Sequence, residues 1–100
     1  MNRTLRNLRA AREEFAAAVR WYEEQRVGLG AEFFDEIEAA TRQLEQYPEM
    51  GSPVSRDLLT RRILVPRFPY HIVYQLTATE IVIVAVAHLK RRPNYWKNRS

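Results

Sequence analysis

The chain has 100 residues, of which 46% are hydrophobic and 28% charged, a composition typical of one soluble domain. Its longest apolar run, residues 81–87, is far shorter than the roughly 20 residues of a membrane-spanning helix. No secretory signal is visible at the N-terminus, so we expect a cytoplasmic protein without a membrane anchor. The lack of cysteine excludes disulfides, a thiolate nucleophile and a cysteine-ligated zinc site.

The formal net charge of +4 is unevenly distributed along the chain. Residues 1–12 hold four arginines and no acid, and residues 13–49 hold three basic and ten acidic residues. Residues 50–100 hold nine basic and two acidic residues. This segregation predicts a positive field on one part of the surface, suited to phosphate backbones or to an acidic protein. Charge alone does not choose between these partners, and a solvated surface without a partner remains a third alternative.

The region from residue 10 to residue 25 predicts an amphipathic helix. It consists mainly of strong helix formers, and its large apolar side chains recur at i, i+4 and i+7, at Phe15, Val19 and Tyr22. The segment Gly28-Leu29-Gly30 follows, and the conformational freedom of glycine suits a turn between two helices. We therefore expect the first helix to end before this segment.

A second amphipathic helix is predicted over residues 31–46. Phe33, Ile37 and Leu44 recur along one side of it. Pro48 lies just past its end, where it cannot continue a helix. Two helices joined by a short turn predict a helical hairpin whose apolar stripes face a common core.

The second half of the chain is rich in β-branched and aromatic residues and predicts strands at residues 61–66, 70–77 and 80–88. Prolines separate the first two strands, because proline cannot donate to a sheet ladder. The segment Thr77-Ala78-Thr79 is short enough to join the last two strands as an antiparallel hairpin. Residues 3–8 offer an additional edge strand.

These elements predict an α+β fold, in which an N-terminal helical hairpin packs on one face of a 3–4-stranded antiparallel sheet. One domain, residues 1–100, accounts for the whole chain. The last strand is apolar on both sides, so we expect its far side, with Val82, Val84 and Val86, to be covered by a partner strand or helix. The expected core consists of Phe15, Val19, Phe33, Ile37, Leu44, Ile72, Tyr74, Ile83 and Ala85.

The sequence lacks the residue patterns that several kinds of active site require. His71 and His88 are the only histidines and lie on different predicted strands without the spacing of a hydrolytic zinc motif. The turn Gly28-Leu29-Gly30 lacks the Lys-Ser/Thr ending of a phosphate-binding loop. We therefore expect no metal and no cofactor.

Basic and aromatic residues concentrate around the C-terminal strands instead. Arginine beside aromatic rings can hold RNA through phosphate contacts and stacking, and the same residue types anchor protein interfaces. The alternatives are a half-buried strand histidine for His71, a hydrogen-bonded residue at a strand end for His88, and a hydrophobic clasp in which Tyr95 and Trp96 fold back on the sheet. The whole set comprises Arg61, Arg62, Arg67, His71, His88, Lys90, Arg91, Arg92, Tyr95 and Trp96.

Four separated segments form one pattern along residues 8–97. They are Trp21-Tyr22-Glu23, the Gly28-Leu29-Gly30 turn followed by Phe33, the run from Arg67 to Tyr74, and His88 followed by Arg91, Pro93, Tyr95 and Trp96. In this order and spacing the chain resembles the RelE/ParE toxin superfamily, specifically its ParE-like, or plasmid-stabilisation, branch. The resemblance implies the toxin of a type II toxin-antitoxin system, held inactive by a cognate antitoxin.

The resemblance also implies one of two activities. RelE-like members cut messenger RNA on the ribosome with basic residues on the sheet and a C-terminal tyrosine, whereas ParE-like members are associated with inhibition of DNA gyrase. Arg62 and Arg91 match positions that are basic in the nucleases. Leu64 and His71 depart from that pattern, because both positions carry cations in the nucleases.

We therefore predict a non-enzymatic gyrase inhibitor that also binds an antitoxin. The first alternative is a ribosome-dependent endonuclease, with the ribosome and messenger RNA as partners and Arg62, His71, Arg91 and Tyr95 as catalytic candidates. The second is an interaction module without toxicity. The residues expected to bind the target or the antitoxin are Arg61, Arg62, Arg67, His88, Arg91, Arg92, Tyr95, Trp96, Val82, Val84 and Val86.

Overall fold

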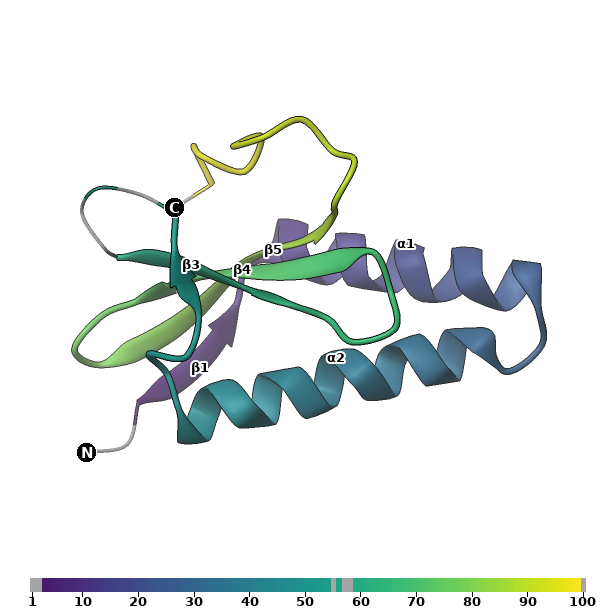
Figure 1. Cartoon of the computed structure of the whole chain (residues 1–100), viewed down its shortest axis with the longest axis horizontal. Helices are drawn as coiled ribbons and strands as arrows, with labels where there is room; N and C mark the ends of the chain where they lie inside the picture. Colours follow the sequence, from purple (N-terminus) through teal and green to yellow (C-terminus); the bar gives the residue numbers. More distant parts are fainter. Residues whose placement is uncertain (1–2, 55, 57–58, 100) are drawn as a thin grey trace.

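The computed structural model describes residues 3–54, 56 and 59–99. Two antiparallel helices lie on one side of a sheet, and the C-terminal segment, residues 89–99, lies on the other (Figure 1). The helices are α1 (Arg9–Gln25) and α2 (Leu29–Gln46). The strands are β1 (Thr4–Asn7), β2 (Ser52–Pro53), β3 (Thr60–Leu64), β4 (Tyr70–Leu76) and β5 (Glu80–His88).

The sheet has the strand order β1-β5-β4-β3-β2. Strands β3, β4 and β5 pair antiparallel, as predicted. Strand β1 pairs with β5 in parallel. The connection between these two neighbours includes both helices and the other three strands, in keeping with the long crossover that a parallel pair requires. The two residues of β2 pair with β3. The predicted sheet of three or four antiparallel strands is therefore corrected to five strands in a mixed sheet, with the N-terminal edge strand confirmed.

The turn between the helices is shorter than predicted, and α2 begins at Leu29. Gly28 has a φ of 91°, a left-handed conformation that glycine adopts without strain. The Glu23 carboxylate accepts hydrogen bonds from the N–H groups of Gly28 and Gly30, which satisfies donors at the start of α2. A Cβ on Gly30 would lie 2.6 Å from the carbonyl oxygen of Val19, so glycine permits the close approach of the two helices.

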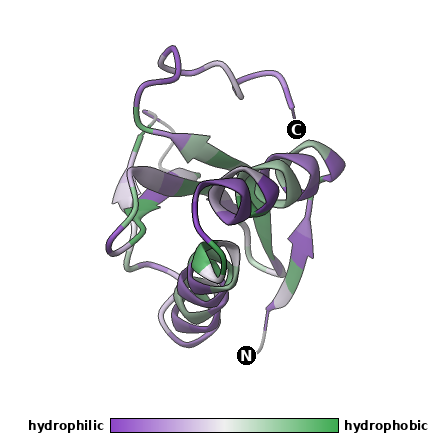
Figure 2. Ribbon diagram, turned by 90° about the vertical axis from the view of Figure 1, so that its right-hand side faces the viewer, coloured by the Kyte–Doolittle hydropathy of each residue, from purple (hydrophilic) through white to green (hydrophobic). Residues whose placement is uncertain are grey.

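The core between the helices and the sheet combines aliphatic side chains with a cluster of aromatic rings. The rings of Tyr22, Phe33, Phe68 and Tyr70 contact one another with centroid distances of 4.9 to 6.2 Å. The central strands are predominantly hydrophobic, whereas the C-terminal segment is largely hydrophilic (Figure 2). The predictions confirmed as buried on this side are Phe33, Ile37, Leu44, Ile72, Tyr74 and Ile83.

Two predicted core residues, Phe15 and Val19, are only partly buried. Helix α1 buries its small residues Ala11 and Ala18 most deeply, and Phe15 and Val19 pack against the same core while staying partly exposed. Phe15 stacks on Phe34 of α2 at a centroid distance of 5.3 Å. Phe15 therefore also contributes to the contact between the two helices.

A β-bulge changes which residues of β5 face the helices. Tyr74 pairs with Ile83 and Val73 pairs with Ala85, so Val84 is an extra residue on β5. Val84 and Ala85 consequently lie together on the side away from the helices, and Val86 returns to the helical side. The prediction of Ala85 as a core residue is confirmed, although its side chain is buried on the far side of the sheet. The prediction that Val86 faces away from the helices is wrong, because Val86 belongs to the helix-facing core. We call the far side, with Val73, Val82, Val84, Ala85 and Ala87, the outer face.

Candidate functional site

The outer face is covered by the chain itself. Tyr95 and Trp96 of the C-terminal segment pack on it together with Leu8. Val82 and Val84 are only 3% and 2% exposed. The prediction that this face is left for a partner is therefore wrong for the isolated chain, and the alternative of an aromatic clasp by Tyr95 and Trp96 is confirmed.

One carboxylate, that of Glu14 on α1, holds the C-terminal segment. Arg99 donates from its two terminal nitrogens to the two Glu14 oxygens, both at 2.9 Å. The Tyr95 hydroxyl donates to the same carboxylate at 2.6 Å, and the N–H of Val86 donates at 3.1 Å. Arg99 also donates to the carbonyl of Val84 at 3.2 Å. Glu14 thus joins α1, β5 and the C-terminal segment.

These contacts also complete the edge of β5. Strand β1 pairs with β5 only as far as Ile83, so β5 has no strand partner on this side beyond that residue. The carbonyl of Val84 and the N–H of Val86 bind Arg99 and Glu14 instead. Buried backbone groups need such partners, because an unpaired one loses its hydrogen bond to water without compensation.

The surroundings of Tyr95 favour the protonated form of its hydroxyl group. Its ring lies between the Arg91 and Arg99 guanidiniums, at 3.9 and 4.9 Å from the ring centroid. Burial of the ring and the hydrogen bond to Glu14 raise the pKa of Tyr95 well above its ordinary value. A phenol in this state anchors a segment better than it transfers a proton to a leaving group.

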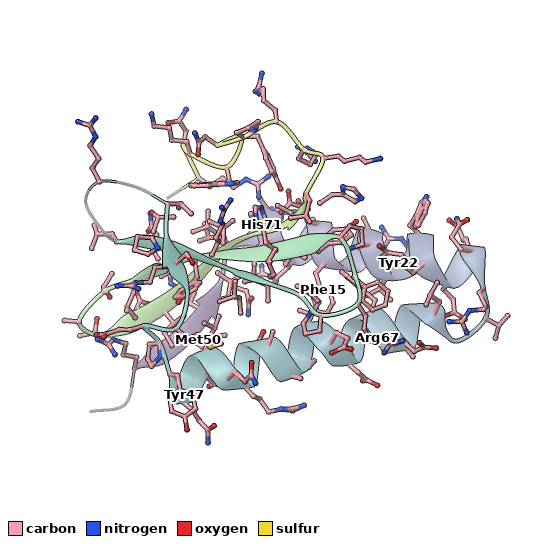
Figure 3. The ribbon with its side chains drawn as sticks, viewed as in Figure 1. Phe15, Tyr22, Tyr47, Met50, Arg67 and His71 are labelled. Atoms are coloured by element: carbon pink, nitrogen blue, oxygen red, sulfur yellow. The ribbon has the colours of Figure 1, made fainter. Side chains whose placement is uncertain are left out.

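Beside the C-terminal segment lies a groove, which we call the basic groove. It consists of two adjoining hollows of about 130 and 460 Å³ that share Arg62, His71 and Leu89. Arg91 and Arg92 line the smaller hollow. His71 extends from β4 on the side of the sheet where the C-terminal segment lies (Figure 3). The smaller hollow thus brings together Arg62, His71, Arg91 and Tyr95, which are all four of the residues named as nuclease candidates.

His71 is neutral at physiological pH in this setting. Burial lowers its pKa, and the charge of Arg62 lowers it further. Its Nδ1 is buried and has no hydrogen-bond partner among the described residues. An uncharged imidazole beside a guanidinium can accept a proton, but no aspartate or glutamate of the described residues lines the groove to orient it.

Two other predicted site residues, both arginines, have contacts within the fold. Arg61 donates to the carbonyls of Glu49 and Gly51 at 3.0 and 2.8 Å, which fixes the connection after α2. Arg67, at the turn between β3 and β4, forms ion pairs with Glu32 and Glu36 of α2 (Figure 3). These contacts explain both arginines without a target.

His88 lies at the end of β5. Its ring packs edge-on against Tyr70 at 5.1 Å, and its Nδ1 accepts a hydrogen bond from the N–H of Lys90. The structure thus agrees with the interpretation of His88 as a hydrogen-bonded residue at a strand end.

The sequence analysis missed Glu14 and Arg99. Glu14 lies three residues after Ala11 and four before Ala18, on the stripe of α1 that faces the sheet. An acid on a buried stripe signals a partner, because a buried carboxylate requires hydrogen bonds or a cation. That signal predicts a basic partner but does not identify Arg99, which is 85 residues distant along the chain.

In the part of the chain that the structure describes, no cluster of three or more histidines and acidic residues is arranged to hold a metal ion. Among the same residues, no helix has the length and apolar character needed to cross a membrane.

A helical hairpin on a five-stranded mixed sheet is also the fold of a solved toxin-antitoxin protein. The chain matches one from the structure described as the chromosomal ParDE TA system from P. aeruginosa, with a TM-score of 0.74 and 17% sequence identity. The match covers 86% of this chain and 95% of that one. The family described as the ParE toxin of the type II toxin-antitoxin system parDE matches residues 5–93, so the chain belongs to this family. A comparison with curated protein sequences finds no match.

Proposed function

We propose that this chain is a cytoplasmic toxin that inhibits DNA gyrase, does not cleave RNA, and is neutralised by a cognate antitoxin. The observation that carries this choice is the state of Tyr95, whose hydroxyl donates to Glu14 and whose pKa is raised. Membership of the ParE toxin family supports the toxin and antitoxin parts of the proposal.

The chemistry of RNA cleavage explains why Tyr95 matters. Without a metal, cleavage needs a base for the 2′-hydroxyl, cations for the developing phosphorane charge and an acid for the leaving oxygen. Tyr95 is engaged by Glu14, and the exposed Leu64 brings an aliphatic side chain to the groove where the resemblance implies a cation. The groove therefore lacks a ready acid and has fewer cations than the nucleases.

RNA cleavage stays the second candidate because of one arrangement. His71 is a neutral imidazole with a free Nδ1, and it shares the basic groove with Arg62 and Arg91. A base and two cations in one hollow are a partial cleavage site. A nuclease of this kind would need a proton donor other than Tyr95.

Induction of the chain alone in a bacterial host tests toxicity. We expect growth arrest, and we expect co-expression of the protein encoded beside it to restore growth and to copurify as a complex. Undisturbed growth, with the folded chain present in the cells, would favour an interaction module without toxicity.

The target is tested by two parallel measurements on the same preparation. Purified chain is titrated into a gyrase supercoiling assay, and messenger RNA ends are mapped on translating ribosomes. We expect loss of supercoiling and intact messages. New cuts in the ribosomal A-site codon, lost in His71→Ala or Arg91→Ala, together with unimpaired gyrase would contradict the proposal.

A further inference from the structure

We propose that a hollow between the helical hairpin and the sheet binds a small uncharged molecule with one or two apolar rings. This hollow, which we call the interlayer hollow, has a volume of about 230 Å³ and is lined by residues of α1, α2, β4 and β5. It shares no lining residue with the basic groove. Binding there is independent of whether gyrase is the target of the chain.

The interlayer hollow lies at the open end of the hairpin, away from the turn at Gly28. Near the turn, the cluster of aromatic rings fills the space between the helices and the sheet. At the open end, α1 presents the small side chain of Ala11 to the hollow. Phe15, which lies between the helices and the sheet (Figure 3), forms one wall. A small residue at this point leaves space that a bound ring can fill with new van der Waals contacts.

The deepest part of the interlayer hollow is apolar. It is formed by four buried side chains, those of Ile37, Ile72, Ile83 and Val86. The Thr41 hydroxyl donates to the carbonyl of Ile37 in its own helix at 2.9 Å. Among the described residues, the buried side-chain atoms without a hydrogen-bond partner belong to Arg61 and His71, and neither residue lines this hollow. Ordered water needs several polar partners, so an apolar ligand displaces water here without leaving a polar group unpaired.

The rim of the interlayer hollow selects against charge. Arg12 and Glu38 line it, and neither takes part in an ion pair within the described part of the chain. Arg12 donates to the carbonyl of Asn7 at 2.8 Å. An anion attracted by Arg12 would be repelled by Glu38, and a cation would meet the reverse. The rim therefore favours a ligand without net charge.

The volume limits the size of the ligand. An apolar cavity of about 150 Å³ is enough to bind benzene, so the interlayer hollow has room for one ring or two fused rings. A helix with its side chains is about 10 Å or more across and is too wide for this space. Such a ligand gains free energy mainly because its own apolar surface leaves water.

The site is tested by titrating the full chain with benzene and with indole and recording the NMR signals of the isoleucine methyl groups. We expect saturable shifts at Ile37, Ile72 and Ile83, with a Kd of about 1 mM or tighter for at least one probe. Ile63 and Ile81 are buried but do not line the hollow, so their shifts should be much smaller.

Two outcomes of this titration would overturn the proposal. The first is the absence of saturable shifts with both probes, which would leave the hollow to the side chain of a partner protein. The second is a set of equal shifts at all the isoleucines, which would show uptake of the probes without a defined site.

Variants that fill the hollow locate the binding. Ala11→Leu should weaken the better probe at least about tenfold, whereas Ala16→Leu, at an exposed position on the same helix, should leave its affinity unchanged. Added volume at a buried position can disturb packing, so Thr41→Leu at the half-buried rim is a second filling variant. Circular dichroism identifies the variants that fold. Unchanged affinity in every folded filling variant would refute the assignment.

Charged analogues test the selectivity of the rim. Benzoate and protonated benzylamine keep the ring of benzene and add one negative or one positive charge. We expect each to bind at least about tenfold more weakly than benzene. Tighter binding of benzoate, lost in Arg12→Gln, would show that the site takes anions and would contradict an uncharged ligand.

Discussion

The two faces of the central sheet are buried by different means. The inner face packs against α1 and α2 through interlocking rings and aliphatic side chains, so its stabilisation comes from apolar area spread over many residues. The outer face bears valines and alanines under a short irregular segment, and one Glu14 carboxylate ties that segment down. Damage to the inner face should unfold the domain, whereas loss of the Glu14 contacts should release one segment.

The largest effect is expected where a side chain of the inner core is removed. Ile37 and Ile83 are 3% and 2% exposed, and Ile37→Ala or Ile83→Ala should each cost about 2 to 5 kcal/mol of unfolding free energy. Urea denaturation monitored by far-ultraviolet circular dichroism measures this cost. Val27→Ala, at a largely exposed position, should stay within about 0.5 kcal/mol. Losses below about 1 kcal/mol at both isoleucines would contradict the described core.

The second-largest effect is expected when Glu14, whose carboxylate holds the C-terminal segment on the outer face, loses its charge. Glu14→Gln removes the negative charge that Arg99, Tyr95 and Val86 share, which should cost about 2 kcal/mol. Hydrogen exchange should quicken at the Val86 amide and in the C-terminal segment, and much less in the helices. Glu13→Gln is the matched control, because Glu13 forms only a highly exposed ion pair with Arg9. Equal effects of the two substitutions would show that Glu14 has no special role.

The third effect is smaller and depends on pH. Tyr95→Phe keeps the ring between the guanidiniums but removes the hydroxyl donor, at a cost of about 1 kcal/mol near neutral pH. Because the folded pKa of Tyr95 lies above its ordinary value of 10.0, this stabilisation is fully present below pH 10 and falls as pH rises further. Chemical denaturation at several alkaline pH values should therefore show the two proteins converging. A constant difference in unfolding free energy would contradict the raised pKa.

The smallest effect concerns an exposed ion-pair network beside the inner core. Hydrogen bonds from Arg67 and then Arg26 lower the pKa of Glu32 below its ordinary value of 4.5. The resulting stabilisation is present above that pH and is lost as pH falls through the lower folded value. Glu32→Gln should flatten this part of the acid unfolding curve. Glu45→Gln, on the same helix without an ion pair among the described residues, should leave the curve unchanged.

The sequence predicted the inner face better than the outer face for a physical reason. The apolar stripes of α1 and α2 recur with the helical period, and β4 and β5 are runs of β-branched and aromatic residues, so each element can be recognised from its own residues. The parallel pairing of β1 with β5 is set by the path of the chain through the hairpin, which no local period reports. Strand β2 has only two residues, too few for any pattern.

The outer face was harder to predict because its determinants are scattered. Residues 81–87 are all apolar, so no alternation revealed the bulge at Val84 or the change of side at Val86. Tyr95 and Trp96 were predicted as a clasp from their aromatic character alone, but the pairing of Glu14 with Arg99 depends on the assembled fold. Composition also does not distinguish cations bound within the fold, as Arg61 and Arg67 are, from cations that face a partner, so the binding of a partner by these two arginines stays a prediction.

The way in which β5 ends its pairing with β1 has a consequence for solubility. A strand edge with open N–H and C=O groups is a template on which another chain can add a strand, and repeated addition leads to aggregation. Beyond Ile83 that edge is blocked by the side chains of Glu14 and Arg99, since they take the hydrogen bonds that an incoming strand would need. The C-terminal segment therefore protects each molecule from polymerising with its neighbours as the chain accumulates in a cell.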